Sequence, residues 1–177
     1  TWLGVLGRTG SGKSTICNLL LRLVETSDGT VSLDGHDVRS VTLASLRGAF
    51  GYVPQDTFLF SDTVRENIRF GRPDATDEDV RKAAEIAGIG QEIEDFPRGM
   101  DTIVGERGVT LSGGQKQRIS IARAILGRPS VIILDDSLSS VDTATEERIQ
   151  KHLREELSGR TSIIVSHRIS SIRDCDQ

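Results

Sequence analysis

The stretch GRTGSGKST at residues 7–15 decides the fold, because it matches the pattern G-x-x-x-x-G-K-[ST] in the setting which that pattern requires. An apolar run at residues 2–6 precedes it and predicts a buried strand. A segment from Lys13 to Val24 follows it and predicts a helix. Glycines let such a loop turn its N–H groups inward, and the positive end of the helix dipole attracts an anion. The sequence therefore predicts a phosphate-binding loop rather than a glycine-rich turn with a solvated lysine.

Two side chains of this loop have the chemistry to bind a nucleotide. Lys13 can reach the β- and γ-phosphates, and the hydroxyl of Ser14 can ligate Mg²⁺. The residues expected to hold the nucleotide are Gly7, Thr9, Gly10, Ser11, Gly12, Lys13, Ser14 and Thr15. The apolar residues expected on the buried face of the following helix are Ile16, Leu19, Leu20 and Leu23, with Cys17 as a packing residue.

Strands and helices alternate along the rest of the chain, which is typical of an α/β fold with a mainly parallel sheet. Further strands are predicted at residues 49–54, 131–134 and 161–165, and a helix at residues 145–157. Asp34-Gly35 is a strong turn pair and predicts a small antiparallel hairpin between residues 30–33 and the run around Val38.

Residues 74–128 have a different pattern and predict an inserted α-helical subdomain. Thr76 and three following acids predict a helix start, and Gly88 predicts its end. A weaker helix is expected at residues 91–95 and a strong one at residues 115–126. We therefore expect one P-loop NTPase domain, with residues 1–73 and 129–177 as its core.

The apolar strand VIIL at residues 131–134 ends in two carboxylates, Asp135 and Asp136. Burial on both faces is typical of a central parallel strand, and α/β sheets bind ligands at the carboxyl ends of their strands. We expect Asp135 beside a Mg²⁺ ion bound at Ser14, and Asp136 where it can polarise a water molecule. A simple turn would explain the two aspartates alone, but the phosphate loop favours the functional interpretation.

A second helix start is rich in glycine. Ser112 and Gln115 have the spacing of a capping box, which is the structural explanation of the stretch LSGGQ at residues 111–115. Gly113 and Gly114 are poor choices for capping alone, since glycine costs about 1 kcal/mol relative to alanine inside a helix. They favour close approach of a bulky anion to backbone N–H groups. The sequence thus predicts two phosphate-binding helix starts.

Composition narrows the class of protein. The 177 residues are 36% hydrophobic and 27% charged, which excludes disordered and collagen-like chains. No apolar run approaches the roughly 18 to 20 residues that cross a bilayer. A net charge of −4 with scattered basic residues argues against a nucleic-acid partner, and two cysteines favour a reducing compartment. Because the chain opens inside a predicted buried strand, we expect a soluble piece of a longer polypeptide, truncated at both ends.

These motifs, in this order, resemble the nucleotide-binding domain of ATP-binding cassette (ABC) transporters. Residues 7–15 resemble the Walker A loop of that family, residues 111–115 are identical to its LSGGQ signature, and residues 131–136 resemble its Walker B strand. The resemblance covers essentially the whole chain. By the same resemblance, the aromatic residue that stacks on adenine lies upstream, so Trp2 is expected in the core.

Three single residues acquire roles only through this resemblance. Gln55, after Pro54, resembles the Q-loop glutamine that touches Mg²⁺ and the attacking water. Asp142 closes a stretch similar to the D-loop, and His167 resembles the switch histidine at the γ-phosphate. Taken alone, Gln55 and His167 would be ordinary polar residues at strand ends.

The resemblance implies binding and hydrolysis of ATP with Mg²⁺. In the family, each ATP lies between the Walker A loop of one domain and the signature of another, so a second nucleotide-binding domain is the implied partner, in a homodimer or a heterodimer. A transmembrane domain, expected in the same full-length chain, is the other. The implied location is the cytoplasmic face of a membrane.

Two segments favour an exporter over an importer. Residues 58–68 resemble the stretch that exporters carry after the Q-loop, and residues 104–108 resemble their X-loop; in the family both face the coupling helices of the membrane domain. The main alternative is a soluble ABC-type ATPase of translation or of DNA repair. Repair relatives insert a long coiled coil, but residues 16–110 show no sustained heptads. A simple P-loop kinase would leave residues 111–115 unexplained.

One position departs from the family pattern. The catalytic base after the Walker B aspartate is normally glutamate, and here it is Asp136, which is one methylene shorter. A misplacement of about 1 Å can cost on the order of a hundredfold in rate. An intact signature beside a shortened base resembles one half of a heterodimeric exporter with one slow and one fast site. A homodimer with two slow sites is the other possibility.

Overall fold

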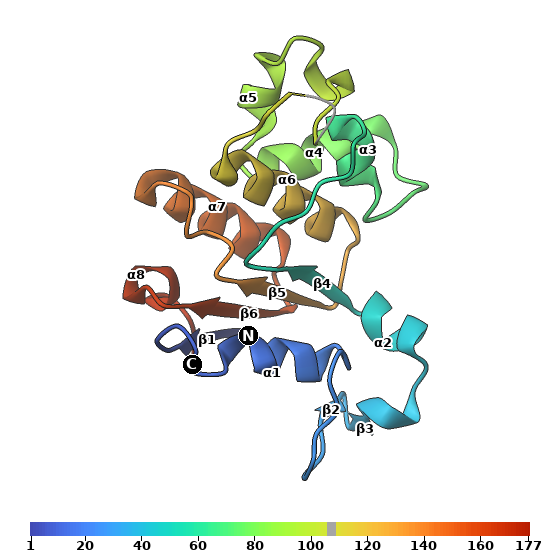
Figure 1. The fold of residues 1–177 in the computed structure, drawn as a ribbon, viewed down its shortest axis with the longest axis vertical. Helices are drawn as coiled ribbons and strands as arrows, with labels where there is room; N and C mark the ends of the chain where they lie inside the picture. Colours follow the sequence, from blue (N-terminus) through green and yellow to red (C-terminus); the bar gives the residue numbers. More distant parts are fainter. Residues whose placement is uncertain (106–108) are drawn as a thin grey trace.

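The computed structural model describes residues 1–105 and 109–177. Its main sheet has four parallel strands in the order β1-β6-β5-β4 (Figure 1). The strands are β1 (Trp2–Leu6), β4 (Phe50–Val53), β5 (Val131–Asp135) and β6 (Thr161–Ser166). A separate antiparallel pair joins β2 (Ser32–Leu33) to β3 (His36–Asp37). The predicted α/β class, with a parallel sheet and a small hairpin, is confirmed.

Helices cover both faces of this sheet. In Figure 1, α1 lies on one face and α7 and α6 on the other, with α6 against β4, while α3, α4 and α5 lie beyond α6 and form the helical layer with it. The helices are α1 (Lys13–Leu20), α2 (Leu43–Gly48), α3 (Val64–Arg69), α4 (Asp77–Ile86), α5 (Gly90–Glu94), α6 (Gly113–Leu126), α7 (Thr143–Glu156) and α8 (Ile169–Ile172), with 3₁₀ turns η1 (Val38–Ser40) and η2 (Gly99–Asp101). No helix of the described ranges is long and apolar enough to cross a bilayer.

Strand β5 divides the hydrophobic core. Ile132 and Leu134 belong to the large cluster that continues through α6 and α7 into the helical layer. Ile133, on the opposite face, belongs to a smaller cluster with Cys17 and Leu21. All five residues of β5 are buried, as expected of a central parallel strand. The end of β5 is therefore fixed on both sides of the sheet.

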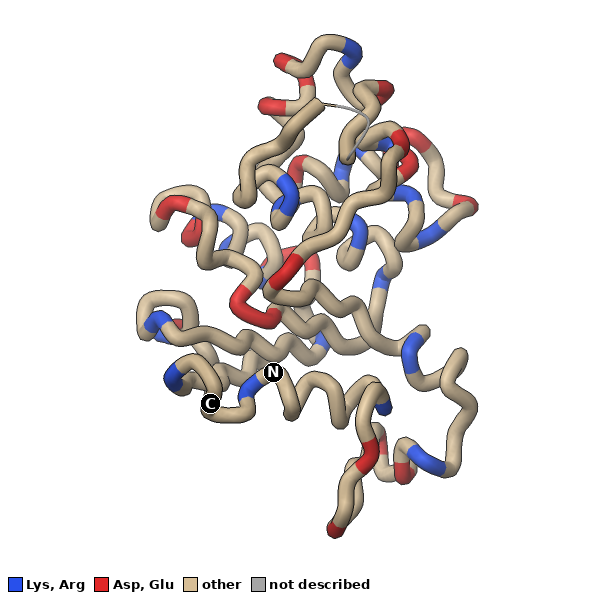
Figure 2. Tube along the Cα trace, viewed as in Figure 1, with Lys and Arg blue, Asp and Glu red and all other residues tan. Residues whose placement is uncertain are grey.

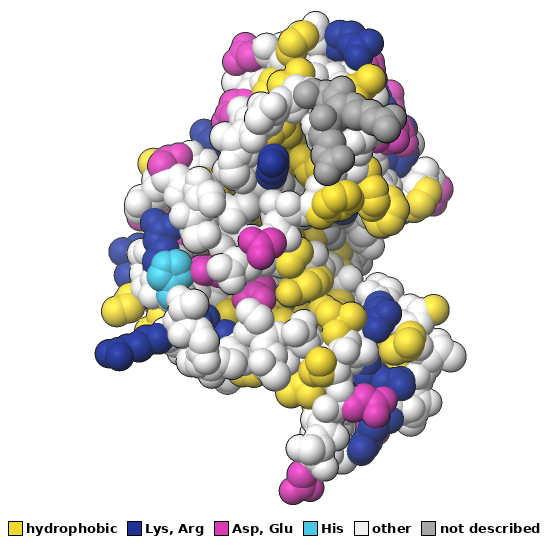
Figure 3. All heavy atoms as spheres, viewed as in Figure 1, with side chains coloured by type: hydrophobic (Ala, Val, Ile, Leu, Met, Phe, Trp, Pro, Cys, Tyr) yellow, Lys and Arg dark blue, Asp and Glu magenta, His cyan; other side chains and the backbone are white. Residues whose placement is uncertain are grey.

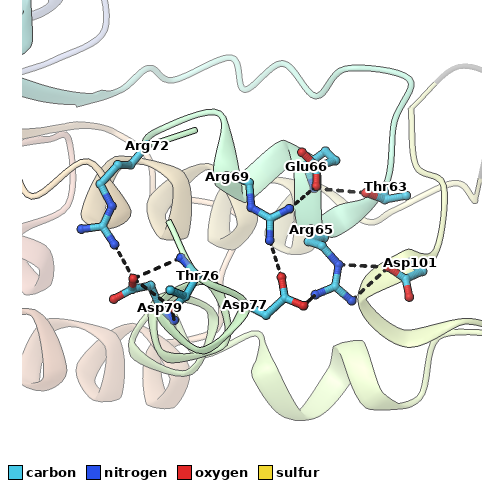
Figure 4. Close-up of polar contacts among 9 residues, drawn as sticks. All are labelled: Thr63, Arg65, Glu66, Arg69, Arg72, Thr76, Asp77, Asp79 and Asp101. Atoms are coloured by element: carbon cyan, nitrogen blue, oxygen red, sulfur yellow. Dashed lines mark hydrogen bonds and ion pairs between the residues drawn. The ribbon is translucent and has the colours of Figure 1, made fainter. Parts of the chain in front are cut away.

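The helical layer is joined by ion pairs as well as by apolar packing. Arg65 of α3 contacts Asp77 of α4 at 2.7 Å and Asp101 of η2 at 3.0 Å, and Arg69 pairs with Glu66 and Asp77 (Figure 4). Basic and acidic positions intermix along the chain rather than gathering on one part of it (Figure 2). Because α3 packs against α4 and α6, the helical layer includes residues before the predicted start at residue 74.

The first helix is shorter than predicted. It ends at Leu20 rather than Val24, because the chain turns at Arg22, whose φ of 49° is left-handed. The guanidinium of Arg47 donates hydrogen bonds to the carbonyls of Leu21 and Arg22, both at 3.1 Å, and so stabilises the turn.

The predicted apolar face of that helix is also wrong in part. Ile16 and Leu23 are exposed, Leu19 and Leu20 are half-buried, and Cys17 is the fully buried residue. The helix therefore packs on the sheet through Cys17, whose role as a packing residue is confirmed. Trp2, likewise, is buried as expected.

Other element boundaries differ by a few residues. Helix α4 begins with the predicted Thr76 cap, but α7 begins at Thr143 rather than at Thr145, because Asp142 caps it. Helices α2, α3 and α8 were not expected from the sequence. Residues 103, 104 and 109 of the predicted helical insertion take part in two isolated β-bridges, one of them with Thr63, rather than in a helix. Of the X-loop-like stretch, residues 106–108 lie outside the described residues.

Candidate functional site

The loop of residues 7–12 connects β1 to α1 in the predicted way. Gly10 and Gly12 have φ values of 81° and 91°, a left-handed conformation that strains residues with a Cβ atom. The side chain of Ser11 lies over Gly7, where an added Cβ would come within 2.5 Å of the Ser11 hydroxyl oxygen. The backbone N–H of Gly7 donates to the carbonyl of Ser166 at 3.3 Å, which joins the loop to the end of β6.

Lys13 spans this loop from the first turn of α1. Its Nζ donates hydrogen bonds to the carbonyls of Gly7 at 2.8 Å and Arg8 at 3.0 Å. No side chain caps α1 within the described part of the chain, since its N-cap residue is Gly12. The first-turn N–H groups and the ammonium group thus gather at one end of the helix, and the space around Gly10 and Gly12 is open. This cradle fits a phosphate group.

Asp135 ends β5 as a buried carboxylate with one polar neighbour. Its residue is 2% exposed, and the hydroxyl of Tyr52 donates to its Oδ2 at 3.3 Å. It forms no ion pair with a lysine or arginine among the residues that the structure describes. A buried carboxylate is costly unless a cation compensates it, so this donor set fits a hard divalent cation.

The pKa values of two neighbouring groups, Cys17 and Tyr52, are raised by burial and by the charge of Asp135. Burial, and secondarily the charge of Asp135, raises the pKa of Cys17 to about 12. The same two causes raise the pKa of Tyr52 above its usual range. Both groups therefore stay protonated at neutral pH, which keeps Cys17 unreactive and keeps the Tyr52 hydroxyl as a donor.

Asp136 and His167 form a pair across adjacent strands. Nδ1 of His167 lies 2.8 Å from Oδ2 and 3.0 Å from Oδ1 of Asp136, although the residues are 31 positions apart in sequence. The register of β5 on β6 pairs Asp135 with Val165, which brings the two following turns together. Asp136 has a φ of 49°, and its N–H donates to the carbonyl of Val165 at 2.8 Å. The strained residue is thus held by its backbone while its carboxylate faces the histidine.

Gln55 lies at the same edge of the sheet but in looser contact. It follows β4, whose last residue Val53 pairs with Leu134 of β5. Its side chain is exposed, and no hydrogen bond to Asp135 or Asp136 is present among the described residues. The structure therefore brings the loop, Asp135, Asp136 and His167 to one edge, with Gln55 beside them.

The LSGGQ stretch lies elsewhere, at the start of α6. Ser112 and Gln115 form the expected capping box, with hydrogen bonds of 3.2 Å and 2.9 Å. In the described part of the chain no hydrogen bond joins residues 112–115 to the loop of residues 7–15. Because α1 and α6 lie on opposite faces of the main sheet (Figure 1), the two predicted phosphate-binding helix starts are separate.

Gly114 has a packing reason that the sequence did not reveal. An added Cβ would lie 2.8 Å from the carbonyl oxygen of Ser140, whereas at Gly113 the nearest atom would be at an ordinary 3.5 Å. Ser140 belongs to the turn between β5 and α7, and its N–H donates to Oε1 of Gln117 at 3.2 Å. Asp142, at the end of this turn, accepts from the N–H of Thr145 at 3.0 Å, and this bond lowers the pKa of Asp142.

Sequence reasoning missed Tyr52, Gln117 and Ser140 as neighbours of the candidate residues. Tyr52 carried a usable signal, since it precedes Pro54-Gln55 on a strand expected beside the one that ends in Asp135. Gln117 and Ser140 carried none, because their contact joins residues 23 positions apart through the packing of α6 on the turn.

Comparisons with known proteins agree with this arrangement. The family described as ABC transporter matches residues 1–139. Heavy metal tolerance factor 1 of Caenorhabditis elegans is 51% identical over 174 residues, which are 98% of this chain and 22% of that protein. The probable multidrug resistance ABC transporter ATP-binding/permease protein YheI of Bacillus subtilis is 49% identical over 174 residues, which are 98% of this chain and 30% of that protein.

A solved structure is similar over almost the whole chain. The structure of a bacterial Atm1-family ABC exporter with ATP bound matches with a TM-score of 0.96 at 44% identity, and covers 99% of this chain and 31% of that one. This chain therefore spans between 22% and 31% of the length of these three relatives. Since the family match takes in most of its residues, the chain belongs to the ABC transporter family, and this membership implies that it binds ATP.

Proposed function

We propose that this chain is the nucleotide-binding domain of an exporter, and that it binds and hydrolyses ATP with Mg²⁺ to drive transport across a membrane. The observation that carries the proposal is the gathering of three features at one sheet edge. They are the open phosphate cradle with Lys13, the buried carboxylate of Asp135, which has no ion-pair partner in the described part of the chain, and the Asp136–His167 pair. The core of residues 1–73 and 129–177 and the helical part of residues 74–128, together with α3, would form this single domain.

The roles follow from the position of each group. The loop residues Gly7 and Thr9 to Thr15 hold the phosphates, and Lys13 releases its hold on two loop carbonyls to reach them. Ser14, Asp135 and Gln55 would hold Mg²⁺. The bound ion supplies Lewis acidity at the phosphate oxygens.

Asp136 and His167 share the proton chemistry. Asp136 orients a water and accepts its proton, while His167, which is exposed on its other side, faces the transferred phosphate. The contact between the two side chains keeps the imidazole oriented, with Nδ1 toward the carboxylate. In the free protein the carboxylate of Asp136 is occupied by His167. A bound nucleotide would therefore have to loosen this contact before Asp136 can act on a water molecule.

A second domain would complete the site. Ser112, Gly113, Gly114 and Gln115 lie at a separate helix start, so they act on the nucleotide of a partner, as does Asp142 through the turn that packs on them. In turn, the signature of the partner contacts the nucleotide that is bound at Lys13. We propose an asymmetric heterodimer in which Asp136 makes the site on Lys13 the slow one.

The membrane domain would dock on an exposed aromatic surface of the helical layer. Phe58, Phe60 and Phe70 are 65%, 40% and 62% exposed, and Phe60 and Phe70 border a hollow of about 500 Å³. The guanidinium of Arg123 stacks on the latter two rings. Hydrophobic side chains gather over this layer on the face shown in Figure 3. We place this surface at the cytoplasmic face of the membrane; the relatives named above favour an exporter over a soluble ATPase.

The test uses the full-length chain that contains this domain, reconstituted into lipid vesicles. We expect Mg²⁺-dependent ATP hydrolysis that falls by at least about a hundredfold in Lys13→Ala. Lys151→Ala, an exposed lysine on α7, is the matched control and should retain full activity. Hydrolysis that survives Lys13→Ala in a folded protein would exclude the proposed site.

A further inference from the structure

The turn of residues 136–142 touches both candidate half-sites of this chain. At one end Asp136 faces His167 at 2.8 Å. In its middle the N–H of Ser140 donates to Oε1 of Gln117, which lies on the first turns of α6. The turn therefore connects the sheet edge with the helix that carries the LSGGQ stretch.

The contact with α6 is close and buried. Gln117 is 4% exposed, and its amide oxygen is 3.2 Å from the Ser140 nitrogen. The carbonyl of Ser140 approaches Gly114 so closely that a Cβ there would lie 2.8 Å away. Both backbone polar groups of Ser140 thus face the same helix. The hydrogen bond that Gln117 accepts fixes the position of the turn along α6. The missing side chain of Gly114 allows the turn to approach the helix closely.

The turn itself is too compact to absorb a displacement. Ser139 donates its N–H to the carbonyl of Asp136 at 3.3 Å, and Val141 donates to Leu138 at 3.1 Å. Val141 is buried, and Asp142 immediately caps α7. These bonds make a short and continuous connection between Gln117 and Asp136.

We propose that Gln117 is a positioning residue which makes the signature helix and the Asp136 carboxylate move together. This inference rests on the proposed function, since in the proposed dimer the signature serves the partner's nucleotide while Asp136 serves the chain's own. Binding of the signature to the partner's nucleotide would then fix the position of the Asp136 carboxylate in the chain's own site. Gln117 touches neither nucleotide.

Hydrogen exchange tests the contact itself, in the full-length chain. Gln117→Met keeps the length of the side chain but removes the acceptor, and should speed exchange of the residue 138–141 amides by about fivefold. Gln117→Glu keeps an acceptor oxygen and should retain most of the protection. Gln150→Met is the matched control, because Gln150 is also buried but donates to Ser171 on the far side of α7. Equal exchange in Gln117→Met and the parent protein would overturn the proposal.

A mixed dimer tests the functional consequence. Only one of the two chains carries Gln117→Met, and each site is silenced in turn by removing the catalytic carboxylate of the chain that forms it, which leaves the phosphate-binding loop of that site intact. We expect both sites to lose about five- to tenfold in kcat, with the KM for ATP within about twofold of the parent value. A loss confined to the partner's site, or a raised KM with unchanged kcat, would show that Gln117 supports only its own helix.

Two further measurements keep the outcomes separate. Gln117→Leu serves as a second variant without an acceptor if Gln117→Met does not fold, and thermal unfolding is recorded for every variant. A Gln117→Glu dimer as slow as Gln117→Met, with both folded, would also overturn the proposal. If the parent protein does not hydrolyse ATP, or Lys13→Ala in both chains leaves hydrolysis intact, the proposed function itself has failed instead.

Discussion

The sheet edge and the start of α6 are both helix starts with glycine, yet they are built in opposite ways. At the sheet edge, left-handed residues, a buried carboxylate and a lysine bonded to its own loop are held by strands from distant parts of the sequence. At α6, the residues 112–115 satisfy one another in a capping box four residues long. The first place depends on the assembled sheet, and the second on local sequence.

This difference indicates which place reorganises when a ligand arrives. The sheet edge holds groups whose partners in the free protein are provisional, since Lys13 contacts backbone carbonyls and Asp136 contacts His167. At the α6 end, the side chains of Ser112 and Gln115 are bonded within the capping box, and Gly114 packs closely against Ser140. We therefore expect the sheet edge to bind and react, and the α6 end to act as a rigid surface offered to a partner.

The largest expected effect is the loss of ATP hydrolysis when Lys13 is replaced. Lys13→Ala should reduce ATP hydrolysis by at least about a hundredfold, because the ammonium group that counters the phosphate charge is gone. Its thermal stability should change little, since Lys13 bonds only to its own loop. Fluorescence-detected nucleotide affinity and thermal unfolding are measured together. Unchanged affinity in the folded variant would remove the distinction between the two helix starts.

The next effect concerns Asp136. Asp136→Glu should restore reach to the attacking water and raise hydrolysis at the site on Lys13, by up to about a hundredfold. The gain will be reduced by backbone strain, because a left-handed φ suits aspartate better than glutamate. Turnover is measured with the partner's own catalytic carboxylate removed.

The control for this prediction is Asp136→Asn, which suits the same backbone but lacks the charge and should lower the rate. Equal rates for Asp136→Glu and the parent protein, with an intact signature in the partner, would show that the short side chain does not limit this site. The asymmetric heterodimer would then lose its support.

A smaller effect is expected on stability when the glycines at the start of α6 are replaced. Gly114→Ala should destabilise the protein by about 1 to 3 kcal/mol, because its Cβ would push against the backbone carbonyl of Ser140. Gly113→Ala is the matched control, with only an ordinary contact at 3.5 Å. Thermal unfolding of the two variants in the full-length chain gives the comparison directly. Equal melting temperatures would mean that the turn yields and that the surface is not rigid.

The smallest effect is a pH dependence at Asp142, where the two regions meet. The hydrogen bond from the Thr145 N–H lowers the pKa of Asp142 in the folded protein. A lowered pKa contributes stability above the unfolded pKa, near 4, and this contribution is lost as the pH falls through the folded value. Asp142→Asn, which cannot titrate, should flatten the melting temperature below about pH 4. An unchanged slope in Asp142→Asn would contradict this prediction.

Local patterns predicted what local chemistry determines. The loop at residues 7–12, the Thr76 cap and the Ser112–Gln115 box were predicted and formed, because each is complete within a few residues. The sequence holds a comparable capping pattern for helix α3, where the hydroxyl of Thr63 accepts from the N–H of Glu66 three residues later. The end of α1 could not be predicted, since Arg47 from a distant helix stabilises the turn at Arg22.

The candidate site was predicted as a set of residues but not as a set of contacts. The placement of Asp135 at the end of a buried strand was correct. The Asp136–His167 contact depends on the register of β5 against β6, and the Tyr52 hydroxyl on the pairing of β4 with β5. Periodicity gives the faces of strands but not their order in a sheet, so these neighbours needed the structure.

The strand order β1-β6-β5-β4 has a consequence for synthesis on the ribosome. The phosphate loop is translated well before β6, but β1 has only β6 beside it in the described sheet, and Gly7 bonds to Ser166. The nascent loop therefore has no sheet to attach to until about 150 further residues have been made. Contacts so distant in sequence form slowly, and exposed strands meanwhile invite wrong pairing. Until β6 emerges, we expect the growing chain to be unable to bind nucleotide and to depend on chaperones.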